Sequence, residues 1–256
     1  MKGLVLGLCL FMAGMVAAPA THAQAQSSVQ KPTATTHSAV TRARTPSRTD
    51  PALMHPASLI AKAPETYEVT FSTTKGDFVV RVTRAWAPLG ADRFYNLVRH
   101  RFYNDMAIFR VASGFVVQFG LGPNPAVNKV WENAKIKDDP VSQSNKPGTI
   151  TFATAGPSTR TTQVFVNLGN NASLDSQGFA PFGEVISGMD VVQSFYSGYG
   201  ETTTNDQENI ATGGKTYLEK TYPKLDVIKT AAVTSPAPAV PAKKPAAAKK
   251  PATPQS

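Results

Sequence analysis

The chain has 256 residues and a formal net charge of +9, and 41% of its residues are hydrophobic. The net positive charge comes from the two ends of the sequence, since residues 1–64 carry a net +5 and residues 231–256 a net +4. Residues 65–230 hold sixteen basic and sixteen acidic residues and so have no net charge. A neutral central segment argues against a nucleic-acid-binding domain, so no nucleic acid partner is expected.

Residues 1–25 have the pattern of a secretory signal peptide. Lys2 precedes an apolar stretch that is short for a membrane span, and small-residue sites end at Ala20 and Ala25. We therefore expect cleavage and export, which makes the mature protein periplasmic or secreted. The single cysteine, Cys9, lies inside this peptide, so cleavage leaves no residue for a disulfide, thiol catalysis or a thiolate metal site.

Two low-complexity segments flank the central part of the chain. Residues 26–64 are rich in Ser, Thr, Ala, Pro and Gln and poor in large apolar residues, which predicts a disordered linker. Residues 233–256 form a tail rich in Pro, Ala and Lys that is expected to be disordered and extended. The lysines of the tail offer a weak contact with anionic envelope polymers or lipid headgroups, although a solvated spacer is the simpler interpretation.

Residues 65–232 have the size of a single domain with one core. The domain opens with two alternating runs, YEVTFST over residues 67–73 and DFVVRVT over residues 77–83, on either side of a glycine turn. This pattern predicts a β-hairpin. Pro88 then opens a segment whose apolar residues have helical spacing, which predicts a helix through His100.

Short strands dominate the rest of the predicted domain. They are expected over residues 107–111, 115–119, 148–153, 163–168 and 181–186, with a second helix after Gly188 and a closing strand over residues 223–233. Many short strands with only two helices indicate a mainly β fold. We predict a closed eight-stranded antiparallel barrel with two capping helices, because closure leaves no unpaired sheet edge.

The motif FRVASGFVVQFG, residues 109–120, places one arginine among apolar residues. If the chain turns at residues 112–114, the two-residue period of a strand puts Arg110 and Gln118 on one outer face. The interior of the barrel then receives Phe109, Val111, Val117 and Phe119.

A second motif, GTITFATAGPSTRTTQVFV over residues 148–166, follows later in the chain. Gln163 and Phe165 are two residues apart and so point the same way, an amide beside an aromatic wall. Together the two motifs describe a small apolar pocket with polar flanks. Such a pocket suits a neutral peptide that carries a proline better than a charged metabolite.

Three motifs, IFRVASGFVVQFG, ATAGPSTRTTQVFV and LDSQGFAPFGEV, stand in the order in which cyclophilins carry them. Residues 67–230 thus resemble the cyclophilins, the barrel-shaped class of peptidyl-prolyl cis-trans isomerases. The resemblance implies a cyclophilin-like β-barrel, isomerase activity without a cofactor or metal, and Pro-containing polypeptides as partners; we expect a monomer. It implies catalytic roles for Arg110, Phe115 and Gln118, and substrate-binding roles for Phe152, Ala153, Thr154, Gln163, Phe165 and Leu174.

Several positions around the implied pocket differ from familiar members of that family. Ser173 stands where many eukaryotic members have tryptophan, and Phe109 and Phe179 lie at or near histidine positions. Thr154 replaces a common asparagine, and Val164 replaces an aromatic residue. These departures imply weak binding of cyclosporin and an altered peptide preference.

The chemistry of the implied reaction explains why one arginine suffices. Rotation about an X-Pro bond makes and breaks no covalent bond, and its barrier of roughly 18–20 kcal/mol comes from lost C–N resonance. A permanently charged guanidinium can donate a hydrogen bond to the prolyl nitrogen as this atom loses conjugation. Two other interpretations stay open: a non-catalytic binder or chaperone of Pro-containing segments, and an envelope-anchoring protein whose function lies in its tail.

Overall fold

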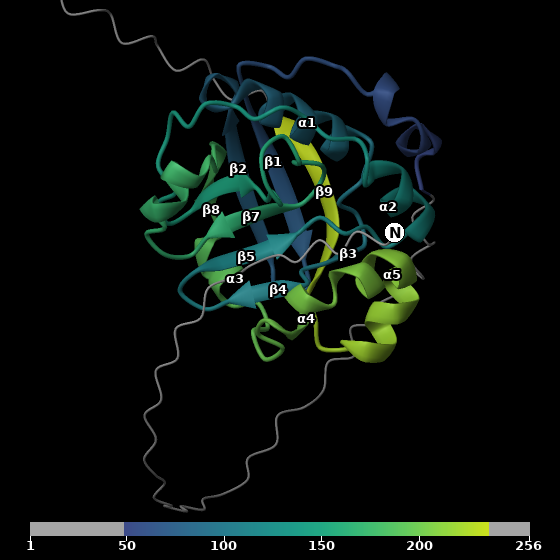
Figure 1. Ribbon diagram of the computed structural model, residues 1–256. Helices are drawn as coiled ribbons and strands as arrows, with labels where there is room; N and C mark the ends of the chain where they lie inside the picture. The colour runs from purple at the N-terminus through teal and green to yellow at the C-terminus, as the bar shows by residue number, and fades with distance from the viewer. Residues whose placement is uncertain (1–48, 236–256) are drawn as a thin grey trace, which may run out of the picture. The chain divides into compact units, whose positions relative to one another are not determined.

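The computed structural model describes residues 49–235, and within them nine strands form one antiparallel sheet (Figure 1). The strands are β1 (Thr66–Thr73), β2 (Asp77–Thr83), β3 (Met106–Ala107), β4 (Arg110–Ala112), β5 (Val116–Phe119), β6 (Thr149–Phe152), β7 (Val164–Asn167), β8 (Pro181–Ser187) and β9 (Val227–Ser235). The α-helices are α1 (Pro88–Arg99), α2 (Pro125–Trp131), α3 (Met189–Gln193), α4 (Thr202–Asn205) and α5 (Gln207–Thr221). Short 3-10 helices are η1 (Pro51–Met54), η2 (Pro56–Ser58), η3 (Arg84–Trp86) and η4 (Ala172–Gln177).

The order of the strands explains how the sheet curls. They pair as β3-β9-β1-β2-β8-β6-β7-β5-β4, and each neighbouring pair is antiparallel. The two edge strands, β3 and β4, are separated by only Ile108 and Phe109, so the sheet has to curve until its edges approach each other. The predicted mainly β, antiparallel class is confirmed.

The strand count differs from the predicted eight, because the strand expected over residues 107–111 is divided between the two edges. Ile108 donates its N–H to the carbonyl of Asp226 just before β9, while Arg110 and the next two residues pair with β5. Among the described residues no ladder joins β3 to β4, so the barrel is open at this point.

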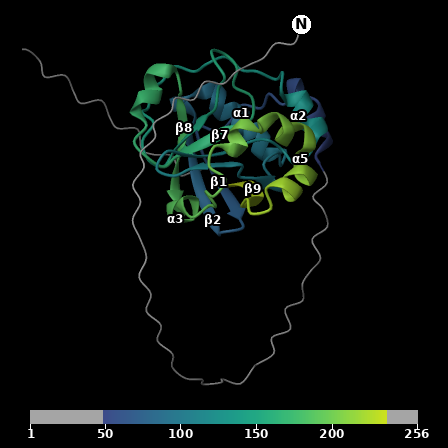
Figure 2. The ribbon, with the colours of Figure 1, turned by 60° about the horizontal axis from the view of Figure 1, so that its bottom comes forward.

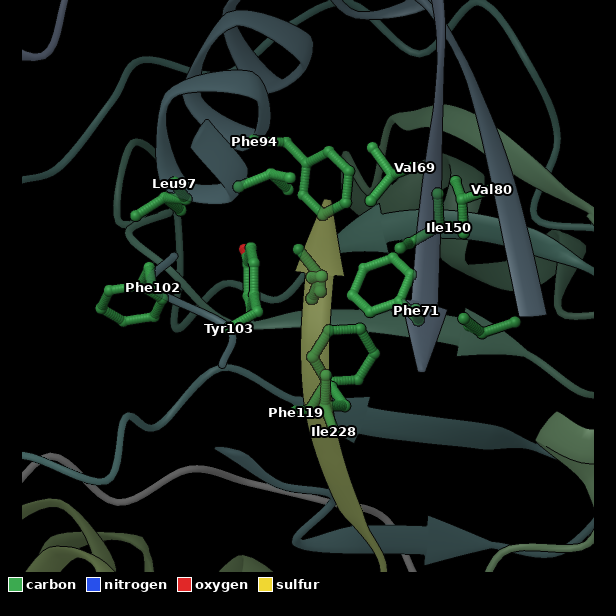
Figure 3. Close-up of a cluster of buried hydrophobic side chains, with 14 of the residues drawn as sticks. Val69, Phe71, Val80, Phe94, Leu97, Phe102, Tyr103, Phe119, Ile150 and Ile228 are labelled. Carbon is green, nitrogen blue, oxygen red and sulfur yellow. The ribbon is translucent and has the colours of Figure 1, made fainter. Parts of the chain in front are cut away.

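The predicted hairpin is confirmed as β1 and β2, which pair from Thr66 with Thr83 to Ser72 with Asp77. Every second side chain of both strands is buried, as the sequence alternation requires. The rings of Phe71 and Phe78 stack with centroids 4.7 Å apart. Figure 3 shows Phe71 facing side chains from the helix α1 and from other strands, which together form the main core.

The predicted helix at Pro88 is also confirmed, as α1. Its first backbone N–H groups, those of Leu89 and Gly90, donate to the two carboxylate oxygens of Asp139 at 2.9 and 2.8 Å. A carboxylate at this end of a helix satisfies donors that have no partner within the helix. Phe94 and Leu97 point from α1 into the core (Figure 3).

The other helices differ from expectation. The helix predicted after Gly188 ends at Gln193, and residues 49–235 hold five α-helices rather than two. The sequence does not predict α5, because its many threonines and the pair Gly213 and Gly214 have low helix propensity. Figures 1 and 2 place α2 and α5 together on one flank of the sheet, with α3 on the other.

A second, smaller apolar cluster lies beneath α5. Phe109 is buried there with Ile210 and Leu218 of α5, outside the main core. The predicted inward orientation of Phe109 is therefore wrong, because this residue lies in the connection between β3 and β4, where strand alternation does not apply. The main core does receive Val111, Val117 and Phe119, as predicted.

Residues 49–64 differ from the disordered linker expected over residues 26–64. Leu53 is buried, and its carbonyl accepts a hydrogen bond from Nε1 of Trp131 at 2.8 Å. The buried side chain of Asn96 accepts from the N–H of Ala61 at 3.1 Å and donates to its carbonyl at 2.7 Å. These contacts dock the segment onto α1 and α2, so it belongs to the folded domain.

The expected signal peptide over residues 1–25, the linker over residues 26–48 and the tail from residue 236 lie outside the described residues. Residues 233–235, expected in the tail, belong to β9. Among the residues that the structure describes, no helix combines the length and apolar character needed to cross a membrane.

Candidate active site

Three neighbouring strands bring the candidate residues into one row. In the registers of β4, β5 and β7, Arg110 lies opposite Gln118, and Gln118 lies opposite Phe165. Residues directly opposite one another in antiparallel strands share a face of the sheet. Because Val117 and Val166 on the other face belong to the core, the row lies on the outer face of the curled sheet.

A chain of side-chain hydrogen bonds runs along this row. Arg110 Nη1 donates to Gln118 Oε1 at 3.0 Å, and Gln118 Nε2 donates to Gln163 Oε1 at 2.8 Å. Gln163 Nε2 donates in turn to Oε1 of Gln207, the first residue of α5, at 3.0 Å. Because each amide accepts with one end and donates with the other, the chain fixes the orientation of both glutamines.

Glu201 binds the other side of the guanidinium. Nε and Nη2 of Arg110 both donate to Glu201 Oε1, at 3.0 and 2.9 Å. The Arg110 side chain is only 11% exposed, whereas that of Glu201 is 48% exposed. Of the five N–H donors of the guanidinium, one on Nη1 and one on Nη2 remain for a substrate.

The apolar part of the site has two sides. Phe115, in the turn between β4 and β5, is 37% exposed, and the guanidinium carbon of Arg110 lies 5.6 Å from the centre of its ring. Such an exposed aromatic ring beside a cation is available to a partner. On the other side, the buried ring of Phe165 packs edge-on against Phe179, with centroids 5.8 Å apart.

Leu174 is half-buried and lies in η4, and hydrogen bonds connect η4 to both sides of the site. Phe179 donates its N–H to the Leu174 carbonyl at 3.2 Å. Asn171, which immediately precedes η4, donates from Nδ2 to the carbonyl of Phe115 at 2.9 Å. The structure thus brings Phe115, Phe165 and Leu174 into one connected region.

Ala153 and Thr154 follow β6 and lie beside Gln163. The N–H of Ala153 donates to the carbonyl of Gln163 at 2.9 Å. The hydroxyl of Thr154 is hydrogen-bonded to that of Thr159 at 2.8 Å and accepts from the N–H of Gly156 at 3.1 Å. Thr154 therefore shapes the loop next to the row instead of presenting a free hydroxyl.

Phe152 is not brought to the site. In the register of β6 and β7 it lies opposite Val164, whereas Thr151 lies opposite Phe165. Phe152 therefore shares the core face of the sheet, where it is 1% exposed and packs on Phe182 with ring centroids 5.1 Å apart. Phe152 therefore lies on the face of the sheet opposite to the row.

Glu201 and Gln207 are missing from the residues that the sequence motifs single out. Both belong to the segment around α4 and α5, more than eighty residues after Arg110, and no motif marks them. The one sequence signal that could indicate them is their chemistry, because an acidic residue and an amide follow Tyr196 and Tyr199.

A cluster around Asp206 holds the start of α5 and with it Gln207. Burial alone would raise the pKa of Asp206, but hydrogen bonds from Tyr217, Asn209 and Tyr222 bring it below its usual value. Burial and the bond to Asp206 raise the pKa of Tyr222 to about 12. The hydroxyls of both tyrosines thus stay protonated at neutral pH and keep donating to the Asp206 carboxylate.

Comparison with known proteins finds relatives of one kind. Peptidyl-prolyl cis-trans isomerase B of Escherichia coli (strain K12) is 32% identical over 169 residues, which cover 62% of this chain and 94% of the relative. A peptidyl-prolyl cis-trans isomerase of Acinetobacter baylyi is 34% identical over 130 residues, covering 48% of this chain and 69% of the relative. A solved cyclophilin type peptidyl-prolyl cis-trans isomerase from Cryptosporidium parvum is 19% identical with a TM-score of 0.48, and the match covers 66% of this chain and 98% of that one.

The family model described as "Cyclophilin type peptidyl-prolyl cis-trans isomerase/CLD" matches residues 68–213, more than half of the chain. This range contains β4, β5 and β7 with the whole row of Arg110, Gln118 and Phe165. The chain therefore belongs to the cyclophilin-type peptidyl-prolyl cis-trans isomerase family.

Proposed function

We propose that this isomerase accelerates rotation about X-Pro bonds in exported or envelope proteins and so assists their folding. The observation that carries the catalytic part is the row in which Arg110, Gln118 and Phe165 lie opposite one another on three strands. The signal-peptide pattern of residues 1–25 supports the exported location, periplasmic or secreted. The lysines after residue 235 add a proposed weak contact with anionic envelope components.

Arg110 is the proposed catalytic group. Two of its N–H donors make no hydrogen bond within residues 49–235, and a guanidinium is a planar cation whose donors lie in a fixed geometry. As the X-Pro bond twists, the prolyl nitrogen loses conjugation and becomes a better acceptor, so a donor fixed beside it favours the twisted state over the planar one. A rate gain of about 10⁵ requires about 7 kcal/mol of such preference, spread over the contacts of the site.

Phe115, Phe165 and Leu174 are proposed to hold the proline ring. The exposed ring of Phe115 supplies one apolar face, and the pair of Phe165 and Phe179 supplies another. Gln118 holds Arg110, and Gln163, with backbone groups of Ala153 and Thr154, is proposed to hold the flanking peptide. Phe152 contributes from the core face of β6, where its ring packs on Phe182 of β8.

A refolding assay separates catalysis from simple binding. The full chain is added at about one-hundredth of the concentration of a protein whose slow refolding phase is limited by X-Pro isomerisation. A catalyst accelerates this phase at the substoichiometric ratio, because each molecule turns over repeatedly. A non-catalytic binder or chaperone changes the phase only near one-to-one, and that result would overturn the catalytic proposal.

Export is tested separately, by the mass and cell fraction of the protein produced from the full gene. Recovery from the periplasm or the medium with the first residues removed supports the proposed location. Recovery of the uncleaved chain from the cytoplasm contradicts it and leaves the catalytic proposal untouched.

A further inference from the structure

Glu201 places a carboxylate in a site whose reaction needs none. Its Oε1 atom accepts both hydrogen bonds from Arg110, and no other side chain within residues 49–235 pairs with the carboxylate. Oε2 therefore has no hydrogen-bond partner in the described part of the chain. Because the Glu201 side chain is 48% exposed, a bound peptide can reach this oxygen.

The backbone holds Glu201 at a fixed position. Its carbonyl accepts from the N–H groups of Thr204 and Asn205 at 3.0 and 3.2 Å, in the turn that becomes α4. Just before it, the ring of Tyr199 packs edge-on against Tyr222, with centroids 5.0 Å apart. The carboxylate is thus presented from an anchored turn and not from a free loop.

The charges of the site give this carboxylate a consequence for substrates. Gln118 and Gln163 are neutral, so Arg110 and Glu201 are the charged members of the hydrogen-bonded network. A basic side chain next to the proline would meet Oε2 of Glu201, while the remaining donors of Arg110 meet the peptide amide. An acidic side chain at that place would meet a carboxylate and be repelled.

We propose that Glu201 is a specificity-determining residue that favours X-Pro bonds flanked by lysine or arginine. The proposal rests on the isomerase function proposed above. It differs from a purely orienting role, in which Glu201 holds Arg110 and affects every peptide equally.

The test compares the full chain with Glu201→Gln on three peptides that differ only in the residue beside the proline: lysine, alanine or glutamate. Glutamine keeps an acceptor for Arg110 and removes the charge. Glu208→Gln is the matched control, since Glu208 is an exposed residue of α5 that makes the same charge change without contacting Arg110. The kcat/KM of each peptide is measured at low and high salt. The set of three peptides is made twice, once with the varied residue before the proline and once with the varied residue after it.

We expect the native chain to prefer the lysine peptide over the alanine peptide by about two- to fivefold at low salt, and to disfavour the glutamate peptide. The preference should shrink at high salt and vanish in Glu201→Gln, while Glu208→Gln keeps it. Equal kcat/KM values for all three peptides in the native chain overturn the proposal. An equal loss on all three peptides in Glu201→Gln overturns it too, since it shows an orienting role alone.

Equilibrium binding of the same peptides separates this proposal from the function on which it rests. If no peptide is isomerised but the lysine peptide binds more tightly through Glu201, the catalytic proposal fails and the specificity stands. If peptides are isomerised without a charge preference, the specificity fails and the catalytic proposal stands.

Discussion

Replacing Gly120 by alanine should push apart the strands that carry the site. Gly120 follows β5 with φ +127°, and a Cβ on it would lie 2.4 Å from Cα of Gln163 and 2.6 Å from the carbonyl oxygen of Thr162. Both are backbone atoms of the segment that enters β7, so the two segments must separate by about 1 Å to reach ordinary contact. Gly114 is the matched control, because its φ is also positive, +73°, but a Cβ there meets nothing within 4 Å.

The two variants differ in the steric contact and, because φ is +127° at Gly120 and +73° at Gly114, also in backbone strain. Alanine at Gly114 bears mainly the cost of the left-handed backbone, about 1–2 kcal/mol. Alanine at Gly120 combines backbone strain of about 1–3 kcal/mol with overpacking of about 1–3 kcal/mol, which is a large part of the 5–15 kcal/mol that stabilises a typical domain. Because the displaced backbone carries Gln163, the kcat/KM of the folded fraction should fall as well, by up to about 100-fold.

Urea unfolding, followed by tryptophan fluorescence, measures both free energies of unfolding, and a peptide assay without denaturant measures kcat/KM. Gly120→Ala is expected to lose clearly more stability than Gly114→Ala. Equal losses would refute the argument, because they would mean that the approach of Gly120 to Gln163 is not what requires glycine.

Two further predictions concern the elements around the site. Asn96→Ala removes the side-chain hydrogen bonds to Ala61, so it should lower the free energy of unfolding by about 2–4 kcal/mol and expose residues 49–64 to proteolysis. The control Asn133→Ala changes an exposed residue and should have little effect on either quantity. Equal resistance of the two variants to proteolysis contradicts the docking of this segment. The pKa of Tyr222 is about 12 in the folded protein and about 10 in the unfolded chain. The contribution of Tyr222 to the free energy of unfolding is therefore complete below pH 10 and is lost as the pH rises toward 12. The difference in Tm between the native chain and Tyr222→Phe should therefore shrink from pH 9 to pH 11.5, and a constant difference contradicts this linkage.

The sequence predicts those parts of the fold that depend on local patterns. The alternation around Gly76 predicts the hairpin of β1 and β2, and Pro88 predicts the start of α1. The same two-residue period predicts that Arg110 and Gln118 share a face, which their direct pairing in β4 and β5 bears out. Local pattern suffices here because neighbouring residues determine both the turn and the alternation.

Other features depend on contacts between distant segments, which no local pattern contains. Phe152 leaves the site because the register places Thr151, and not Phe152, opposite Phe165, and a shift by one residue reverses the face. Glu201 reaches Arg110 only because the turn before α4 lies beside β4, with the first residue of α5 held by Gln163. Residues 49–64 have the composition of a disordered linker, yet the buried Leu53 and Ala63 and hydrogen bonds to α1 and α2 dock them on the domain.

The proposed catalytic group is the guanidinium of Arg110. Its most direct test is the kcat/KM of Arg110→Ala on a Pro-containing peptide, beside Arg81→Ala as the control. Arg81 is a strand arginine whose Nε and Nη2 also donate to one glutamate oxygen, that of Glu68, but it lies on β2, outside the row. We expect kcat/KM to fall by about 100- to 1000-fold in Arg110→Ala with the fold retained, and to change by less than about twofold in Arg81→Ala. Similar activity of the two variants would contradict the catalytic role of Arg110.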